Sequence, residues 1–151
     1  DGNIVLGDFG LASQSASQKP ESVFHTPCGT MTYRAPEIMG DQPYGPKVDV
    51  WAAGLTIYTL VTGHDPWATT TTSNNQMVVI MRKIAQGKIN KFPSHCSNAV
   101  QDFIGKCIML NPEERMSSQE ALEHPWLRLA SVFSKDELPA NIVSKKQQAS
   151  V

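Results

Sequence analysis

Residues 47–63 read KVDVWAAGLTIYTLVTG, and apolar side chains recur there on nearly every face of a helix. A surface helix carries a narrower apolar stripe, so we expect this helix to be buried on most sides at the centre of the fold. Its uncharged run from Val50 to Val61 is well short of the roughly 20 residues that a membrane span requires. Asp49 at the start of the run and Gly54 inside it are unusual for plain core filling.

The composition describes an ordinary globular chain. It has 151 residues, of which 40% are hydrophobic and 18% charged, enough to form one domain with a sizeable core. Thirteen basic and fourteen acidic residues give a net charge of −1, so no overall field attracts nucleic acid or anionic lipid. The three cysteines are far apart and form no Cys-x-x-Cys pair, which favours reduced thiols in a cytosolic or nuclear protein.

The front of the chain predicts one short strand and one exposed loop. Residues 4–6, Ile-Val-Leu, are β-prone and follow a turn at residues 1–3, so the chain begins within what resembles a hairpin. We therefore expect a piece of a longer protein. Residues 11–27 are rich in Ser, Gln and Pro with few apolar anchors, which predicts an exposed loop. Pro36 then suits the first turn of a short helix that runs to Met39.

The back of the chain predicts three further helices and hence a mainly α fold. Residues 64–75 form a loop with a low-complexity run, and apolar residues at helical spacing from Met77 to Ile84 precede a stop at Gly87. Ser117 and Glu120 have the spacing of a capping box for a last helix that ends near His124-Pro125-Trp126. In between, Ser97 caps a helix whose expected core face is Val100, Phe103, Ile104, Cys107 and Leu110.

Asp8 stands after the β-prone run, and the glycine that follows lets the backbone pivot before the polar loop and an Ala-Pro-Glu helix start. This order is that of the protein-kinase motifs. Residues 1–129 resemble the C-terminal lobe of eukaryotic protein kinases, and residues 130–151 resemble a polar tail or linker. The motifs in family order are Asp8-Phe9-Gly10, Gly29-Thr30, Ala35-Pro36-Glu37, Asp49-Val50-Trp51 with Gly54, and Asn111-Pro112 with Arg115.

The resemblance implies a nucleotide role for the first motif. Asp8 would hold Mg²⁺ that bridges the phosphates of ATP, since a hard cation prefers oxygen ligands. Phe9 would pack beneath the site, and Gly10 would provide the hinge. The alternative for Asp8 is a turn-capping side chain.

The loop and the segment after it match the regulatory and docking parts of the family. Thr26 lies four residues before Thr30, where a phosphate could order the loop by pairing with Arg; the alternative is an unmodified surface threonine. Gly29, Thr30 and Tyr33 resemble the substrate-docking segment of serine/threonine kinases, so the implied partner is a protein with Ser or Thr acceptors.

Structural roles follow for the remaining motif residues. Ala35 and Pro36 shape the helix start, while Glu37 and Arg115 would form a largely buried ion pair. Trp51 and Gly54 would serve packing. Pro66-Trp67, Phe92-Pro93 and His124-Pro125-Trp126 match the family as packing and turn elements without chemical roles.

The resemblance also gives Asp49 a role. In the family, its counterpart accepts hydrogen bonds from the backbone of the catalytic loop, which this chain does not contain. We therefore expect a partly buried carboxylate without donors, and an isolated chain that is marginally stable at this end.

Several catalytic motifs of the family are absent from these 151 residues, namely the Gly-rich loop, the strand Lys and the His-Arg-Asp run with its Asn. We expect the full-length protein to be an ATP- and Mg²⁺-dependent serine/threonine kinase and this chain alone to be an inactive, incomplete domain. The alternative is a pseudokinase or a non-catalytic binding module.

Residues 92–127 look like the calcium/calmodulin-dependent kinase group, and residues 138–151 are similar to the segment after the kinase domain of calcium-dependent kinases. This resemblance implies a calcium sensor module or calmodulin as a partner. The alternative is an ordinary solvated C-terminus. No EF-hand pattern occurs in the chain.

Overall fold

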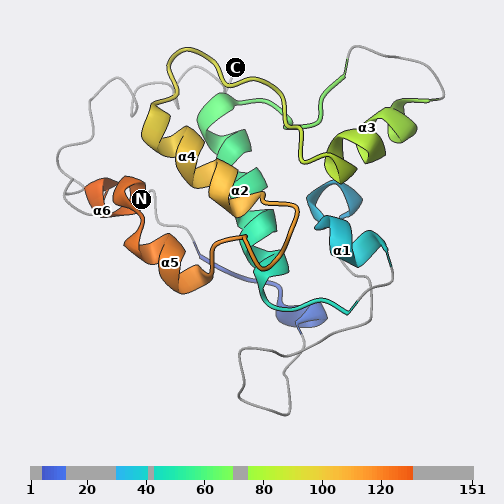
Figure 1. The fold of residues 1–151 in the computed structure, drawn as a ribbon, viewed down its shortest axis with the longest axis horizontal. Coiled ribbons are helices and arrows are strands. Elements are labelled where there is room, and N and C mark those ends of the chain that lie inside the picture. The colour runs from blue at the N-terminus through green and yellow to red at the C-terminus, as the bar shows by residue number, and fades with distance from the viewer. Residues whose placement is uncertain (1–4, 13–29, 41–42, 70–74, 131–151) are drawn as a thin grey trace, which may run out of the picture.

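The computed structural model describes residues 5–12, 30–40, 43–69 and 75–130 (Figure 1). In this part the chain is mostly helical, which confirms the mainly α class. Among the described residues, none of the helices combines the length and apolar character that crossing a membrane requires. The elements in chain order are the 3₁₀ turns η1 (Phe9–Leu11) and η2 (Met31–Tyr33), followed by α1 (Pro36–Met39), α2 (Lys47–Thr62), α3 (Gln76–Ala85), α4 (Asn98–Cys107), α5 (Ser118–Glu123) and α6 (Pro125–Ala130).

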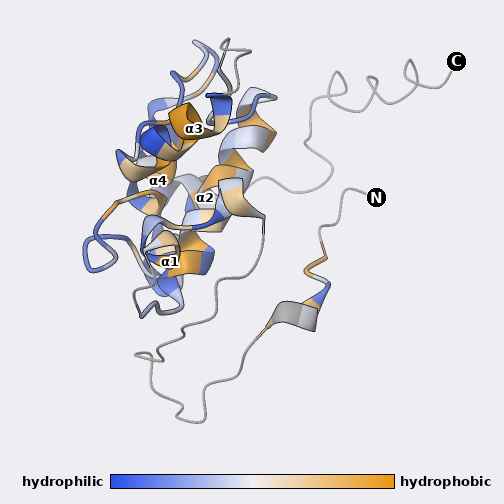
Figure 2. Cartoon of the chain, turned by 90° about the vertical axis from the view of Figure 1, so that its right-hand side faces the viewer, coloured by the Kyte–Doolittle hydropathy of each residue, from blue (hydrophilic) through white to orange (hydrophobic). Residues whose placement is uncertain are grey.

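The N-terminal segment differs from the strand that the sequence predicts. Residues 5–8 have no regular secondary structure, and residue 4 lies outside the described residues. A strand requires backbone partners on a neighbouring strand, and no second strand lies beside this segment in the described part of the chain. Val5 and Leu6 are 85% and 82% exposed, and Figure 2 shows the segment set apart from the helices.

Helix α2 is central, but it is buried on one side rather than on most sides. Its opposite face is open: Asp49, Ala53 and Thr56 are exposed, and Leu60 is 68% exposed. Small and polar side chains occupy most of that face. The prediction that the helix is buried on most sides therefore overestimates its burial. The buried face consists of Val50, Trp51, Gly54, Leu55, Tyr58 and Thr62.

The end of α2 follows from Gly63. Its φ of 71° lies in the left-handed region that favours glycine. Its N–H donates to the Thr59 carbonyl at 2.9 Å, so the helix ends where the sequence predicts.

Helices α2 and α4 lie side by side, as Figure 1 shows and their contacts confirm. Gly54 makes this approach close, because a Cβ atom there would lie 2.4 Å from Cys107 Cβ. Ser97 caps α4 by accepting the Val100 N–H. Leu110, expected on the core face of α4, lies beyond the helix end and is 42% exposed.

Helix α3 ends before Gly87, whose φ of 60° allows the stop that the sequence predicts. Only Ile84 of this helix is buried, and Met77 and Val78 at its start are exposed. The apolar spacing therefore predicts the helix correctly but overestimates how much of it is covered.

The last predicted helix, α5, ends where the sequence predicts, and a further short helix, α6, follows it. The capping box is present: Ser117 Oγ accepts the Glu120 N–H, and the Glu120 carboxylate accepts the Ser117 N–H at 2.7 Å. Helix α5 ends at Glu123, and α6 begins at Pro125. His124 between them has extended backbone angles (φ −63°, ψ 136°), because a residue that precedes proline is disfavoured in the helical region.

Candidate functional site

Asp8 presents a carboxylate that the local backbone does not use. It precedes η1 with φ 59° and ψ 68°, a left-handed conformation that Asp tolerates better than most residues. Its side chain makes no capping hydrogen bond to η1, so the turn-capping alternative is not what this structure shows. The residue is exposed. Asp8 therefore offers one hard oxygen donor group to the solvent.

Phe9 and Gly10 lie beside this carboxylate. Phe9 is 65% exposed, so in this structure it does not pack beneath the site as we expect. A Cβ at Gly10 would lie 3.4 Å from Asp8 Oδ1, an ordinary contact. Close approach therefore does not explain the glycine.

The predicted docking segment is described from Thr30 onward; Thr26 and Gly29 lie outside the described residues. Residues 31–33 form the single turn η2, in which the Tyr33 N–H donates to the Thr30 carbonyl at 3.0 Å and the Arg34 N–H donates to the Met31 carbonyl at 3.2 Å. Met31 and Tyr33 are 41% and 37% exposed. The segment therefore presents two large side chains at the surface.

Trp67 holds this segment from the bundle side. Its indole Nε1–H donates to the Thr32 carbonyl at 2.8 Å. The ring is completely buried and stacks on Trp51, with centroids 6.4 Å apart. From the sequence alone, Trp67 is expected to serve packing. The overlooked signal is its indole N–H, which usually finds an acceptor when it is buried.

Glu37 and Arg115 form the ion pair that the resemblance implies. Arg115 Nη1 and Nη2 donate to Glu37 Oε1 and Oε2 at 2.6 and 3.0 Å. Arg115 also donates from Nε to the Met109 carbonyl and from Nη1 to the Lys47 carbonyl. Its guanidinium carbon lies 5.1 Å from the centre of the Trp51 ring. One buried cation thus joins α1, the start of α2 and the loop after α4.

Asp49 does not meet the expectation of a partly buried carboxylate. It lies in the first turn of α2 and is exposed, where the helix dipole favours a negative charge. The argument that its desolvation destabilises the isolated chain is therefore wrong for this structure.

Other motif residues serve packing in the structure. Ala35 is completely buried, and Pro36 takes the first position of α1. The close α2–α4 contact accounts for Gly54. Trp51 is fully buried, and its Nε1 is the one buried side-chain polar atom without a hydrogen-bond partner among the described residues.

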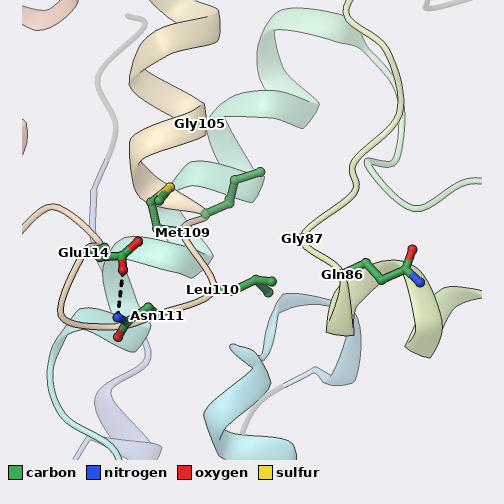
Figure 3. Close-up of a pocket in the computed structure, with 8 residues that line it drawn as sticks. Gln86, Gly87, Gly105, Met109, Leu110, Asn111 and Glu114 are labelled. Atoms are coloured by element: carbon green, nitrogen blue, oxygen red, sulfur yellow. Dashed lines mark hydrogen bonds between the residues drawn. The ribbon is translucent and has the colours of Figure 1, made fainter.

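A hollow of about 440 Å³ lies between the ends of α3 and α4 (Figure 3). Met109 and Leu110 line it, and a Cβ at Gly87 would lie 3.2 Å from Leu110 Cγ. Its single charged lining residue, Glu114, accepts a hydrogen bond from Asn111 Nδ2 at 3.0 Å. The hollow therefore brings together no set of groups for catalysis.

The described residues also contain no cluster of three or more His, Cys, Asp or Glu side chains that could hold a metal ion. Burial raises the pKa of the Cys107 thiol to about 12 and raises the pKa of Tyr58. Both side chains lie in the core, so these shifts reflect packing rather than an active site.

The family description "Protein kinase domain" matches residues 1–127. The chain belongs to the protein kinase family. The match covers Asp8, the docking segment and both partners of the buried ion pair.

Curated relatives of this kinase chain come from plants, animals and fungi. It is 31% identical to CBL-interacting protein kinase 5 of Oryza sativa subsp. japonica, over 99% of this chain and 30% of that protein. It is 37% identical to the serine/threonine-protein kinase H1 homolog of Danio rerio, over 84% of this chain and 29% of that protein. It is 32% identical to the calcium/calmodulin-dependent protein kinase cmkA of Emericella nidulans, over 92% of this chain and 33% of that protein. The chain thus spans about a third of the length of these relatives.

Proposed function

We propose that this chain is the helical lobe of a protein serine/threonine kinase that transfers the γ-phosphoryl group of ATP to Ser or Thr hydroxyls of a protein substrate. The observation that carries the proposal is the fixation of residues 32–37 on the helical bundle. Trp67 holds the Thr32 carbonyl and Arg115 holds the Glu37 carboxylate. This leaves Tyr33 partly exposed between two fixed points. A surface held in this way suits the docking of an extended substrate segment.

ATP and Mg²⁺ are the cofactors of this proposal, and Asp8 fits one part of the metal site. Mg²⁺ is usually bound by one or two carboxylates together with substrate phosphates and water. Asp8 has an exposed carboxylate that does not cap its own turn, so it can supply one such ligand. Bound Mg²⁺ would neutralise charge on the phosphates during transfer. Phosphorylation of Thr26 is part of the same proposal.

The chain alone is proposed to be inactive. Its 151 residues contain no His-Arg-Asp run to supply the catalytic base and no Gly-rich loop to cover the phosphates. A calcium sensor is the proposed regulatory partner, supported by a relative that is itself named as calcium/calmodulin-dependent. The cytosol or nucleus is the proposed location.

The test is phosphoryl transfer by the full-length protein from labelled ATP to Ser, Thr and Tyr peptides. We expect transfer to Ser or Thr, and loss of at least about 100-fold in kcat for Asp8→Asn, because electrostatic neutralisation dominates this reaction. Asp136→Asn, outside the residues that match the family, is the matched control and should retain activity.

Two outcomes would contradict the proposal. Binding of ATP with Mg²⁺ without any transfer would favour the non-catalytic alternative. Transfer by residues 1–151 alone would show that the predicted inactivity of this chain is wrong.

A further inference from the structure

We propose that Trp67 is a positioning residue for the protein substrate, acting through its hydrogen bond to the docking segment. The inference rests on the proposed function, since it assigns a role within the same site. The family resemblance gives Trp67 a packing role only. The observation behind the inference is the distance of 2.8 Å from its Nε1 to the Thr32 oxygen.

The bond fixes a backbone group that η2 itself does not use. Within the turn, the carbonyls of Thr30 and Met31 accept the N–H groups of Tyr33 and Arg34. The Thr32 carbonyl instead accepts from a side chain 35 positions along the chain. The indole has one donor and no acceptor, so this contact is directional.

The Trp67 ring cannot easily follow the segment if the segment moves. It is completely buried and lies nearly parallel to Trp51, with 19° between the ring planes. Trp51 in turn lies against the Arg115 guanidinium, which holds Glu37. The two anchor points of the docking segment therefore belong to one packed set of side chains.

The loop that carries Trp67 is fixed from a second direction. The Trp67 N–H donates to Asp65 Oδ1 at 2.6 Å. Lys83 Nζ, on α3, donates to the Ala68 carbonyl at 3.0 Å and to Asn90 Oδ1 at 2.8 Å. Asn90 completes the network, with its side-chain amide donating to the Ala68 carbonyl and its backbone N–H donating to Pro66. The indole is therefore held in place before any substrate binds.

The experiment replaces the indole and keeps an aromatic ring. In the full-length protein, Trp67→Phe leaves the Thr32 carbonyl without its donor, so we expect a rise of about threefold to tenfold in KM for a peptide substrate. The kcat and the KM for ATP should stay within about twofold of wild type. Trp126→Phe, which changes a half-buried tryptophan on α6, is the matched control and should leave all three constants unchanged.

An unchanged peptide KM in Trp67→Phe, or a fall in kcat with no change in KM, would overturn the inference. If Trp67→Phe does not fold, Lys83→Met is the second variant, because it keeps the indole and removes the hydrogen bonds that Lys83 donates to its loop. It should raise the peptide KM in the same direction, and an unchanged KM would count against the inference.

A readout independent of activity separates this inference from the proposed function. Amide hydrogen exchange over residues 30–35 should be faster in Trp67→Phe than in Trp126→Phe, whether or not the protein transfers phosphate. If the wild type is inactive, the proposed function fails and this comparison alone decides whether Trp67 positions the segment. Equal exchange rates in the two variants would overturn it.

Discussion

The Glu37 carboxylate and the Arg115 guanidinium, 78 positions apart in the chain, meet through two hydrogen bonds of 2.6 and 3.0 Å. Arg115 is only 1% exposed. Its Nε and Nη1 also donate to the carbonyls of Met109 and Lys47 at 3.0 and 3.1 Å. A buried cation is tolerated when its donors are paired in this way, so the pair ties α1 to the rest of the bundle at little net cost.

Removing one partner of this pair should lower the free energy of unfolding by much more than the intact pair contributes to it. Glu37→Gln leaves the Arg115 charge buried without its counter-ion, and we expect a loss of about 3–5 kcal/mol in the free energy of unfolding. Urea denaturation measures it. Lys106→Gln, which removes one partner of the exposed Asp102–Lys106 pair, is the control and should cost less than about 1 kcal/mol. Equal losses in both variants would show that the burial of Arg115 is not decisive.

Replacing two glycines of α2 and α4 by alanine should change the stability of the protein in opposite directions. Gly54→Ala would place a Cβ 2.4 Å from Cys107 Cβ, so we expect a loss of about 1–3 kcal/mol through overpacking. At Gly105, on α4, a Cβ would meet nothing within 4 Å. Gly105→Ala should therefore stabilise the helix by about 0.5–1 kcal/mol. Thermal unfolding of both variants checks the sign of each change.

A rescue experiment sharpens this prediction. Cys107→Ala should not restore the stability of Gly54→Ala, because the clash is with the β-carbon that alanine retains. If it did restore stability, the sulfur atom would be the obstacle.

The helices of this chain can be predicted from its sequence better than the surroundings of each helix can. The starts of α2 and α4 and the capping box of α5 follow from local patterns that involve neighbouring residues. The exposure of Leu60, Phe9 and Asp49 depends on which other segments pack there, and periodicity carries no information on that. The hydrogen bond from Trp67 to Thr32 cannot be predicted for the same reason, since it joins two segments that no local pattern relates.

The buried thiol of Cys107 should make the folded protein less stable at alkaline pH. Burial raises its pKa from 9.0 to about 12, so between these values the unfolded chain releases a proton that the folded chain retains. Stability should therefore fall as pH rises from about 9 to 12, by up to about 1.4 kcal/mol per pH unit. Tyr58, whose pKa burial also raises, adds to the fall above pH 10.

Urea denaturation across this pH range measures the slope. Cys107→Ala should make the slope shallower whatever its effect on stability at neutral pH. An unchanged slope would exclude Cys107 as its source. The native protein should also react slowly with thiol reagents at this residue, because the thiolate is the reactive form.

Helix α4 and the α5–α6 junction meet at a histidine whose tautomer the contacts determine. His124 Nδ1 accepts the Trp126 N–H at 3.3 Å, while its Nε2 faces Asp102 Oδ2 at 3.1 Å. A carboxylate only accepts, so the proton of neutral His124 lies on Nε2. We expect ¹⁵N spectra of the neutral ring to show the proton on Nε2 and not on Nδ1. A proton on Nδ1 would contradict the contact with Trp126.

Asp102, which contacts His124 at this junction, should make stability depend on pH in the acid range. Hydrogen bonds from Lys106 first, and from His124 second, hold the pKa of this carboxyl below its ordinary value. A carboxyl whose pKa is lowered by folding contributes stability above its unfolded pKa, and that contribution is lost as the pH falls through the folded pKa.

Lys106→Met should raise the pKa of Asp102 toward its ordinary value, because it removes the hydrogen bond from Lys106. The ¹³C chemical shift of the Asp102 carboxyl, recorded as a function of pH, measures this pKa. Lys88→Met, which changes an exposed lysine just after α3, should leave that pKa unchanged. Equal shifts in both variants would mean that the overall charge, rather than the hydrogen bond from Lys106, controls Asp102.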